Sequence, residues 1–305
     1  MGPDGGLCTP RTPLPLPMPW PMPWGGRYSP ILSITAAWNL LRCSHPEPVF
    51  AVTFAIAVLA LSAGRGWSTG WAVAAVLAGQ LFVGWTNDYL DREQDRLSGR
   101  TDKPLVSGLV PAGRVRIAAL LALWACVPLS LANGLAAGAV HLAAVGLATL
   151  YNLRLRSTPA SVFPYLVCFG LVPAFITLGL HPGHLPPFWA SAGGALLGAG
   201  GHFTQVLPDI EADRRLGIRG LPQLLGVRGS TLVAAVLLFE SALLILLGPG
   251  NPGELQLAVL GLTLLVIGGV IGAGLSGRHR LSFRLTLVAA GGVAVIFILS
   301  GGALA

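Results

Sequence analysis

The chain has 305 residues, of which 53% are hydrophobic and 10% are charged, with a formal net charge of +7. Soluble domains carry about 25% charged residues, so this composition excludes an ordinary soluble domain and is typical of an integral membrane protein. Its four cysteines include no CxxC pair, which excludes a disulfide framework and a cysteine zinc site.

Residues 1–35 form a segment rich in proline, with the run "PLPLPMPWPMPW". Proline at this density is typical of a disordered or polyproline II segment. The segment also lacks the charged-then-apolar order of a signal peptide. We therefore predict a disordered tail over residues 1–35 and one transmembrane domain over residues 36–305.

Nine apolar runs follow, each close to the roughly 20 residues that a membrane-spanning helix needs. They cover residues 48–64, 70–87, 115–132, 134–151, 162–180, 187–207, 231–248, 255–275 and 283–303. Spanning strands are excluded because an open sheet leaves backbone groups unsatisfied in lipid. The predicted fold class is an all-α integral membrane protein with nine transmembrane helices.

The basic residues support this count, because nine spans place all of them except Arg65 on one side of the membrane, together with the N-terminus. The positive-inside rule assigns that side to the cytoplasm and the C-terminus to the outside. Charges held at a bilayer favour anionic lipid as a partner and exclude nucleic acid. The scarcity of lysine, with abundant alanine and glycine, favours a bacterial inner membrane as the location.

The two longest polar loops, between spans 2 and 3 and between spans 6 and 7, repeat one pattern. A shift of 118 positions, which lays Asp91 on Asp209, gives T-[NQ]-x3-D-x-E-x-D-R-x2-G-x4-P-x3-G in copies near residues 86–108 and 204–226. A gapless match of this length predicts an internal repeat. Parallel repeats also occur in transporters, so the repeat alone does not define a function.

Each motif copy, treated as a helix, places its polar side chains within an arc of about 100°. These side chains are Asn87, Asp88, Asp91 and Asp95 in the first copy and His202, Gln205, Asp209 and Asp213 in the second. Carboxylates one turn apart repel unless cations neutralise them. Oxygen ligands favour magnesium, which takes one or two carboxylates and completes its shell with water and substrate phosphates. Two facing motifs, each with a magnesium ion, are therefore predicted to bind one diphosphate.

Basic residues follow each motif and can contact phosphate oxygens. They are Arg92, Arg96, Arg100, Lys103, Arg214, Arg215 and Arg219. For a single DxxxD, a solvated helix end whose aspartates pair with such arginines is the simpler interpretation. The duplicated register favours the metal site instead.

Three segments resemble the signatures of the UbiA family of intramembrane prenyltransferases. "NDYLDREQD" at residues 87–95 is similar to the first aspartate-rich signature, and "DIEADRRLGIRGLPQLLG" at 209–226 is similar to the second. "YNLR" at 151–154 resembles the Y-x-x-K element, with arginine for lysine. The resemblance implies a helical bundle around a central cavity that opens towards the lipid. It also implies transfer of an isoprenoid from its diphosphate to a small, commonly aromatic acceptor through an allylic carbocation.

By position, the resemblance assigns metal binding to Asn87, Asp88, Asp91, Asp95, Asp209 and Asp213, and catalysis to Asp91, Asp95, Asp209 and Asp213. It further implies that Arg100, Lys103 and Arg154 bind the diphosphate and that Tyr151 lines the site. Two further arginines, Arg42 and Arg214, are expected near the diphosphate. His202 is an expected acceptor contact, although some aromatic prenyltransferases of the family carry aspartate at its position.

The predicted function is thus a magnesium-dependent prenyltransferase with two ions, acting on an isoprenoid diphosphate and a small acceptor. A terpene cyclase on the same scaffold is the alternative, because the cation can be trapped by its own double bonds. A transporter could also use acidic helix ends as an ion site. It would need acidic residues deeper in the membrane, where this chain has only Glu240.

Overall fold

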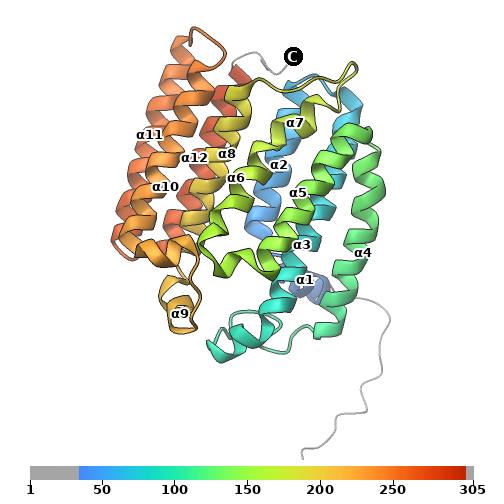
Figure 1. The fold of residues 1–305 in the computed structure, drawn as a ribbon, viewed down its shortest axis with the longest axis vertical. Coiled ribbons are helices and arrows are strands. Elements are labelled where there is room, and N and C mark those ends of the chain that lie inside the picture. Colours follow the sequence, from blue (N-terminus) through green and yellow to red (C-terminus); the bar gives the residue numbers. More distant parts are fainter. Residues whose placement is uncertain (1–33, 300–305) are drawn as a thin grey trace, which may run out of the picture.

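The computed structural model describes residues 34–299, and within this range every regular element is a helix (Figure 1). Residues 1–33, and with them nearly all of the predicted proline-rich tail, lie outside the described part. The predicted all-α class is confirmed.

The first half of the bundle contains five α-helices. They are α1 (Ile34–Arg42), α2 (Pro46–Ser62), α3 (Thr69–Leu97), α4 (Ala112–Leu131) and α5 (Leu135–Leu153). The described chain also contains three 3₁₀ turns, which are η1 (Gly66–Ser68), η2 (Leu155–Ser157) and η3 (Pro159–Val162). The second half comprises α6 (Phe163–Gly170), α7 (Val172–Thr177), α8 (Phe188–Val206), α9 (Ile210–Arg215), α10 (Leu221–Leu247), α11 (Glu254–Leu275) and α12 (His279–Leu299).

Seven helical segments of the described chain are long and apolar enough to cross a membrane, and the count is eight if the bent pair α1–α2 forms one span. The protein is therefore an integral membrane protein, as predicted. The count of nine is not confirmed, because the glycine-rich α8 is not among these segments. The fifth predicted span is broken between α6 and α7, with Pro173 in the first turn after the break.

The bundle has two sides that meet along α2, α5, α6 and α8 (Figure 1). Helix α3 packs between α2, α4 and α5 on one side, while α10, α11 and α12 pack together on the other. Tight contact depends on small residues at some crossings. At Gly198, for example, a Cβ would lie 2.4 Å from the Phe169 ring, so only glycine lets α8 approach α6 this closely.

An 83° bend separates α1 from α2 and places the start of α2 against α3. Gly84 of α3 permits this contact, because a Cβ there would lie 2.3 Å from the carbonyl oxygen of Ser44. The next residue, Trp85, donates its indole N–H to the carbonyl of Leu40 at 2.8 Å. His45, at the bend itself, has a positive φ of 58°. The bend thereby carries the imidazole of His45 to the polar end of α3.

The two motif copies end their helices in the same way. Gly99 and Gly217 have φ values of +69° and +78°, the left-handed conformation common after a helix C-terminus. The N–H of Arg100 donates to the carbonyl of Asp95 at 3.0 Å, and Ile218 N–H donates to Asp213 at the same distance. This equivalence supports the internal repeat, which remains a prediction.

The second copy does not form the continuous helical face that was predicted for it. Helix α8 ends at Val206, and α9 begins at Ile210 with Asp209 as its N-cap residue. Pro208 lies in this break, where its ring and missing N–H prevent the helix from continuing. His202 and Asp213 therefore belong to two separate helices, and the arc that joined them was wrong.

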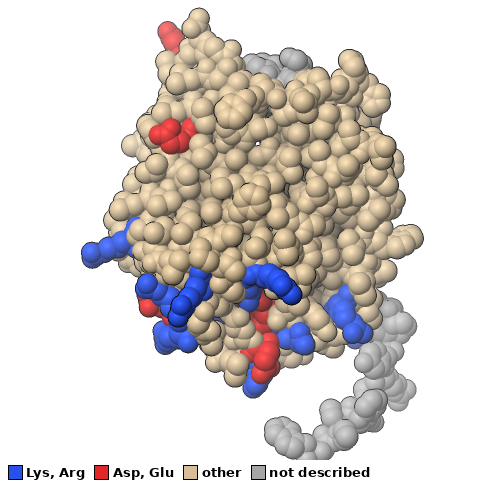
Figure 2. Space-filling model, in the orientation of Figure 1, with Lys and Arg blue, Asp and Glu red and all other residues tan. Residues whose placement is uncertain are grey.

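Most charged side chains visible in Figure 2 lie at one end of the bundle, the end at which α3 terminates and α9 lies. Arg65 lies elsewhere, between α2 and η1, with 6% of its surface exposed. Which aqueous side each end faces stays a prediction.

Candidate functional site at the charged end of the bundle

A cavity of about 1080 Å³ extends from the charged end into the bundle. Its walls come from α2, α3, α5, α6, α8 and the segments around α9, together with the start of α12. Aspartates, arginines and amides line the outer part, and valine, alanine and aromatic side chains line the inner part. The cavity can thus hold a molecule with a charged head and an apolar body.

Four aspartates predicted as catalytic line this one cavity, although two come from each motif copy. They are Asp91, Asp95, Asp209 and Asp213. Each accepts a hydrogen bond from a basic or amide side chain. Two of these bonds come from Lys103 to Asp95 at 2.7 Å and from Gln223 to Asp213 at 2.7 Å. The structure therefore brings together residues far apart in the sequence, as the duplicated motif predicted.

Asp88 is nearly inaccessible, with 2% of its surface exposed, and is held from two directions. Lys103 Nζ donates to its Oδ1 at 2.9 Å, and His45 Nε2 lies 3.2 Å from the same oxygen. Asp88 is absent from the cavity wall, whereas Asn87 lines it. Lys103 therefore holds the Asp88 carboxylate in position.

The loop after α3 connects the two motif copies through its basic side chains. Arg100 donates from Nη1 to Asp209 Oδ1 at 2.7 Å, and Lys103 donates to Asp88 and Asp95 of α3. Burial opposes the protonated form of Lys103, but the two carboxylates raise its pKa. Both cations line the cavity and therefore hold positive charge beside the aspartates.

Arg156 is a further basic residue of the cavity, on the short turn η2. Its Nη1 donates to Asp91 Oδ2, and its Nη2 donates to Gln94 Oε1 at 2.8 Å. The residue predicted for this role, Arg154, is exposed and does not line the cavity. The backbone of Arg154 leaves the helical conformation with a φ of −144°, and the chain then turns through η2 so that Arg156 faces the aspartates.

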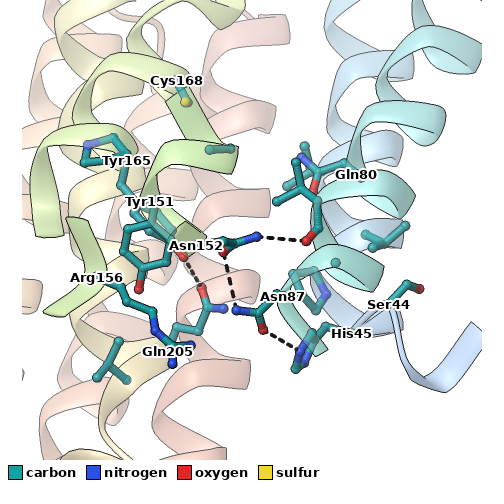
Figure 3. Close-up of a pocket in the computed structure, with 18 of the residues that line it drawn as sticks. Ser44, His45, Gln80, Asn87, Tyr151, Asn152, Arg156, Tyr165, Cys168 and Gln205 are labelled. Carbon is teal, nitrogen blue, oxygen red and sulfur yellow. Dashed lines mark hydrogen bonds between the residues drawn. The ribbon is translucent and has the colours of Figure 1, made fainter. Parts of the chain in front are cut away.

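Side chains from α2 and α3 on one side of the cavity face side chains from α5, α6 and α8 on the other (Figure 3). On the α6 side, Tyr165 donates its hydroxyl to Gln205 Oε1 at 3.2 Å, with its ring centroid 5.2 Å from that of Tyr151. From the α3 side, Asn87 donates to Oδ1 of Asn152 on α5 at 3.3 Å, so this hydrogen bond joins the two sides. Tyr151 lines the cavity as the sequence predicted.

Three other predicted substrate contacts lie away from the cavity wall. Arg42 is exposed and donates to the backbone carbonyl of Asp102 at 3.0 Å, and Arg214 is exposed on α9. His202 is 1% exposed and packs its ring on Tyr165, 4.4 Å between centroids, with Nε2 3.2 Å from Ser161 Oγ. Glu240 is also outside the cavity, on the exposed face of α10.

Sequence patterns gave no signal for several cavity residues that the structure reveals. They are His45, Gln94, Asn152, Arg156 and Gln223. Of these residues, only Gln223 could have been proposed from the sequence, because it follows Pro222, which the repeat aligns with Pro104. The others reach the cavity through bends and helix contacts that no local pattern encodes.

The donor set fits a hard divalent cation that shares its shell with a phosphate. Within residues 34–299, no three His, Cys, Asp or Glu side chains converge closely enough to form a complete metal site. Magnesium needs only one or two carboxylates when substrate phosphates supply the rest. Burial raises the pKa of Asp213 to about 6, and the carboxylates of Asp209 and Asp91 add to this rise. Such crowded negative charge is relieved by a cation.

The fold and this cavity define a helical integral membrane protein with a carboxylate-rich site at one end of the bundle. The sequence model of the UbiA prenyltransferase family matches residues 49–281. The chain therefore belongs to the UbiA prenyltransferase family, which confirms the resemblance of its motifs.

A curated relative, the digeranylgeranylglyceryl phosphate synthase of Methanothrix thermoacetophila, is 31% identical over 173 residues. The match covers 53% of this chain and 61% of the relative, so the chain spans about three fifths of that protein.

Two solved structures share the fold. A UbiA homologue from Aeropyrum pernix K1 has a TM-score of 0.66 and 23% identity, covering 83% of this chain and 97% of its own. A UbiA homologue from Archaeoglobus fulgidus, bound to GPP and Mg²⁺, has a TM-score of 0.59 and 18% identity, with coverage of 87% and 99%.

Proposed function

We propose that the protein is a magnesium-dependent intramembrane prenyltransferase that moves an isoprenoid from its diphosphate to a small aromatic acceptor. The observation that carries this proposal is the convergence of both aspartate motifs at the mouth of one cavity whose inner part is apolar. Family membership and the GPP and Mg²⁺ bound to the Archaeoglobus homologue support it.

Asp91 and Asp95 from one motif and Asp209 and Asp213 from the other would hold the ions, for which we propose two sites. When bound, Mg²⁺ supplies positive charge that stabilises a departing diphosphate. The chain adds the charges of Arg100, Lys103 and Arg156 around the same mouth. These groups are already in place and need little reorganisation during the reaction.

The reaction breaks the bond between C1 of the isoprenoid and the diphosphate oxygen, whose electron pair leaves with the diphosphate. A nucleophilic atom of the acceptor then bonds to C1 and loses its proton. The rings of Tyr151 and Tyr165 lie just inside the aspartates, where they can flank an aromatic acceptor and face a developing cation. The apolar inner wall keeps water from the cation.

The proposal is tested with purified protein in lipid nanodiscs, Mg²⁺ and a series of isoprenoid diphosphates. Asp91→Ala and Asp213→Ala are each expected to abolish diphosphate release while the protein remains folded. Glu211→Ala is the matched control, because Glu211 lies within the second motif but is exposed. Full turnover by either aspartate variant would contradict the assignment.

The acceptor requires its own arm of the experiment. Aromatic acids and a glyceryl phosphate are offered in parallel, since the name of the Methanothrix relative indicates the second class. Prenylated aromatic product is expected. A cyclic terpene formed from the diphosphate alone would identify a cyclase instead.

A further inference from the structure

Asp213 differs from the other motif aspartates in the partner that holds it. Each of the others accepts a hydrogen bond from a lysine or arginine that lines the cavity. These bonds run from Lys103 to Asp88 and Asp95, from Arg156 to Asp91 and from Arg100 to Asp209. Asp213 instead accepts one from Gln223 Nε2 at 2.7 Å, and within residues 34–299 Arg156 acts on it only at longer range. The charge of Asp213 is therefore not neutralised by direct contact.

The helix that carries Asp213 cannot fix this carboxylate by itself. Helix α9 has six residues, of which only Ile210 is buried, and it packs chiefly against α10. Pro208 separates α9 from α8, so the long helix that precedes the motif does not continue into it. The position of Asp213 consequently depends on α10.

Gln223 lies on the first turn of α10, which buried side chains hold in place. The N–H of Leu221 donates to Ser161 Oγ at 3.0 Å, and His202 Nε2 lies 3.2 Å from the same oxygen. Ser161 and His202 are each 1% exposed. Gly220 leaves room for the side chain of Gln223, because a Cβ there would lie 2.4 Å from its Oε1. The amide of Gln223 therefore has a fixed position.

One end of this amide has no partner. Gln223 is 4% exposed and lines the cavity, yet its Oε1 accepts no hydrogen bond from the described residues. Buried polar atoms are nearly all hydrogen-bonded, so an unpaired one calls for an explanation other than the stability of the fold. The unpaired Oε1 costs stability, while the N–H at the other end serves Asp213.

We infer that Asp213 binds the first divalent cation before any diphosphate arrives, and that Gln223 is the positioning residue that holds its carboxylate without neutralising it. A cation that approached one of the other aspartates would first have to displace a bound lysine or arginine. Magnesium can take a single carboxylate and keep water in the rest of its shell. This inference rests on the proposed function, and it adds an order of binding and a residue that the repeated pattern does not specify.

The experiment measures the binding of Mn²⁺ to the purified protein without diphosphate. The protein is held in nanodiscs of phosphatidylcholine, whose zwitterionic heads avoid the ion binding of anionic lipids. Electron paramagnetic resonance counts the free ions, and empty nanodiscs are the blank. The measurements are made at pH 8, where a carboxyl with a pKa of about 6, such as that of Asp213, is ionised.

Two variants change the amide, and a neighbour on α10 serves as the control. Gln223→Met removes the amide but keeps a similar volume, whereas Gln223→Lys puts a cation in its place. Leu224→Met is the matched control, since Leu224 is the next residue and is 50% exposed. Asp95→Asn and Asp213→Asn compare the two motifs.

Gln223→Met is expected to raise the Kd of Mn²⁺ by about 10- to 100-fold, the usual effect of removing the partner of a metal ligand, and Leu224→Met to leave it unchanged. Gln223→Lys and Asp213→Asn are expected to abolish binding. Asp95→Asn should leave the Kd nearly unchanged, because Lys103 already neutralises that carboxylate. Without metal, Gln223→Met should melt close to the native protein, since the lost hydrogen bond and the removed unpaired oxygen oppose each other.

A native Kd in Gln223→Met, or equal loss of binding in the Asp95 and Asp213 variants, would overturn the inference. If Gln223→Met does not fold, native binding by Gln223→Lys would overturn it as well. The titration is then repeated with geranyl diphosphate. A native protein that binds Mn²⁺ only together with the diphosphate would overturn the order of binding and leave the proposed function intact. If the diphosphate is neither bound nor cleaved, the proposed function fails and the inference fails with it.

Discussion

Replacing Arg156 with glutamine tests whether the turn η2, and not the end of α5, supplies the cation that contacts the diphosphate. The Arg156 side chain is 20% exposed and uses two of its five N–H donors on Asp91 and Gln94. Its remaining donors are free to reach phosphate oxygens at the mouth of the cavity. Arg154→Gln removes the same charge two residues away from an exposed position.

A hydrogen bond to a charged group contributes about 1.5–3 kcal/mol, and solvent screening is weak for a side chain this buried. At about 1.4 kcal/mol for each factor of ten, Arg156→Gln should lower kcat/KM for diphosphate release by about 10- to 150-fold. Arg154→Gln should change it by less than about twofold, because exposed charges interact weakly with the site.

Release of diphosphate by the purified variants is measured beside their thermal unfolding, since Asp91 also loses a partner in Arg156→Gln. Arg156→Lys restores the charge and should recover part of the rate. Equal loss in the Arg154 and Arg156 variants, or loss only in Arg154→Gln, would refute the placement of the cation.

Three further predictions follow from contacts at the same end of the bundle. Gly84→Ala should lower the melting temperature by several degrees, because its Cβ would overlap the Ser44 carbonyl and displace the bend before α2; an unchanged melting curve contradicts that contact. Lys103→Met should cost about 3–5 kcal/mol of stability without added metal, as breaking a buried ion pair does, since Asp88 and Asp95 lose their shared cation. Added Mg²⁺ should recover part of this loss, measured as the shift of the melting temperature. Chelation with EDTA should stop diphosphate release by the native protein and Mg²⁺, but not K⁺, should restore it; activity that survives chelation would exclude a divalent requirement.

Hydropathy located the helices well because the cost of exposing polar groups to lipid acts on every residue of a span. The same reasoning could not find the break between α6 and α7, because both pieces are equally apolar and only their packing separates them. The prediction of α8 as a span stays unconfirmed, because glycines that serve close packing dilute the apolar character of this helix.

The site was partly predictable, for a similar physical reason. Carboxylates that repeat at helical spacing show their common direction within one helix, so Asn87, Asp91 and Asp95 of the first motif line the cavity together, whereas Asp88 does not line it. The second motif was wrongly predicted as one helical face, because the chain changes direction at Pro208, between α8 and α9. Arg156 was missed because the chain turns at η2, so that Arg156 and not Arg154 faces the cavity. His202 shares the turn of α8 that precedes the motif, yet its ring is buried against Tyr165.

The polar side chains of the cavity lie at the charged end of the bundle, and its apolar side chains lie deeper. The charged head of an amphiphile in the cavity therefore lies at the end where the charged side chains gather, and it can leave into the water on that side. A hydrophobic remnant has the opposite preference and partitions into the surrounding bilayer. The polarity of the two parts of the cavity therefore favours different exits for a water-soluble leaving group and for an oily product.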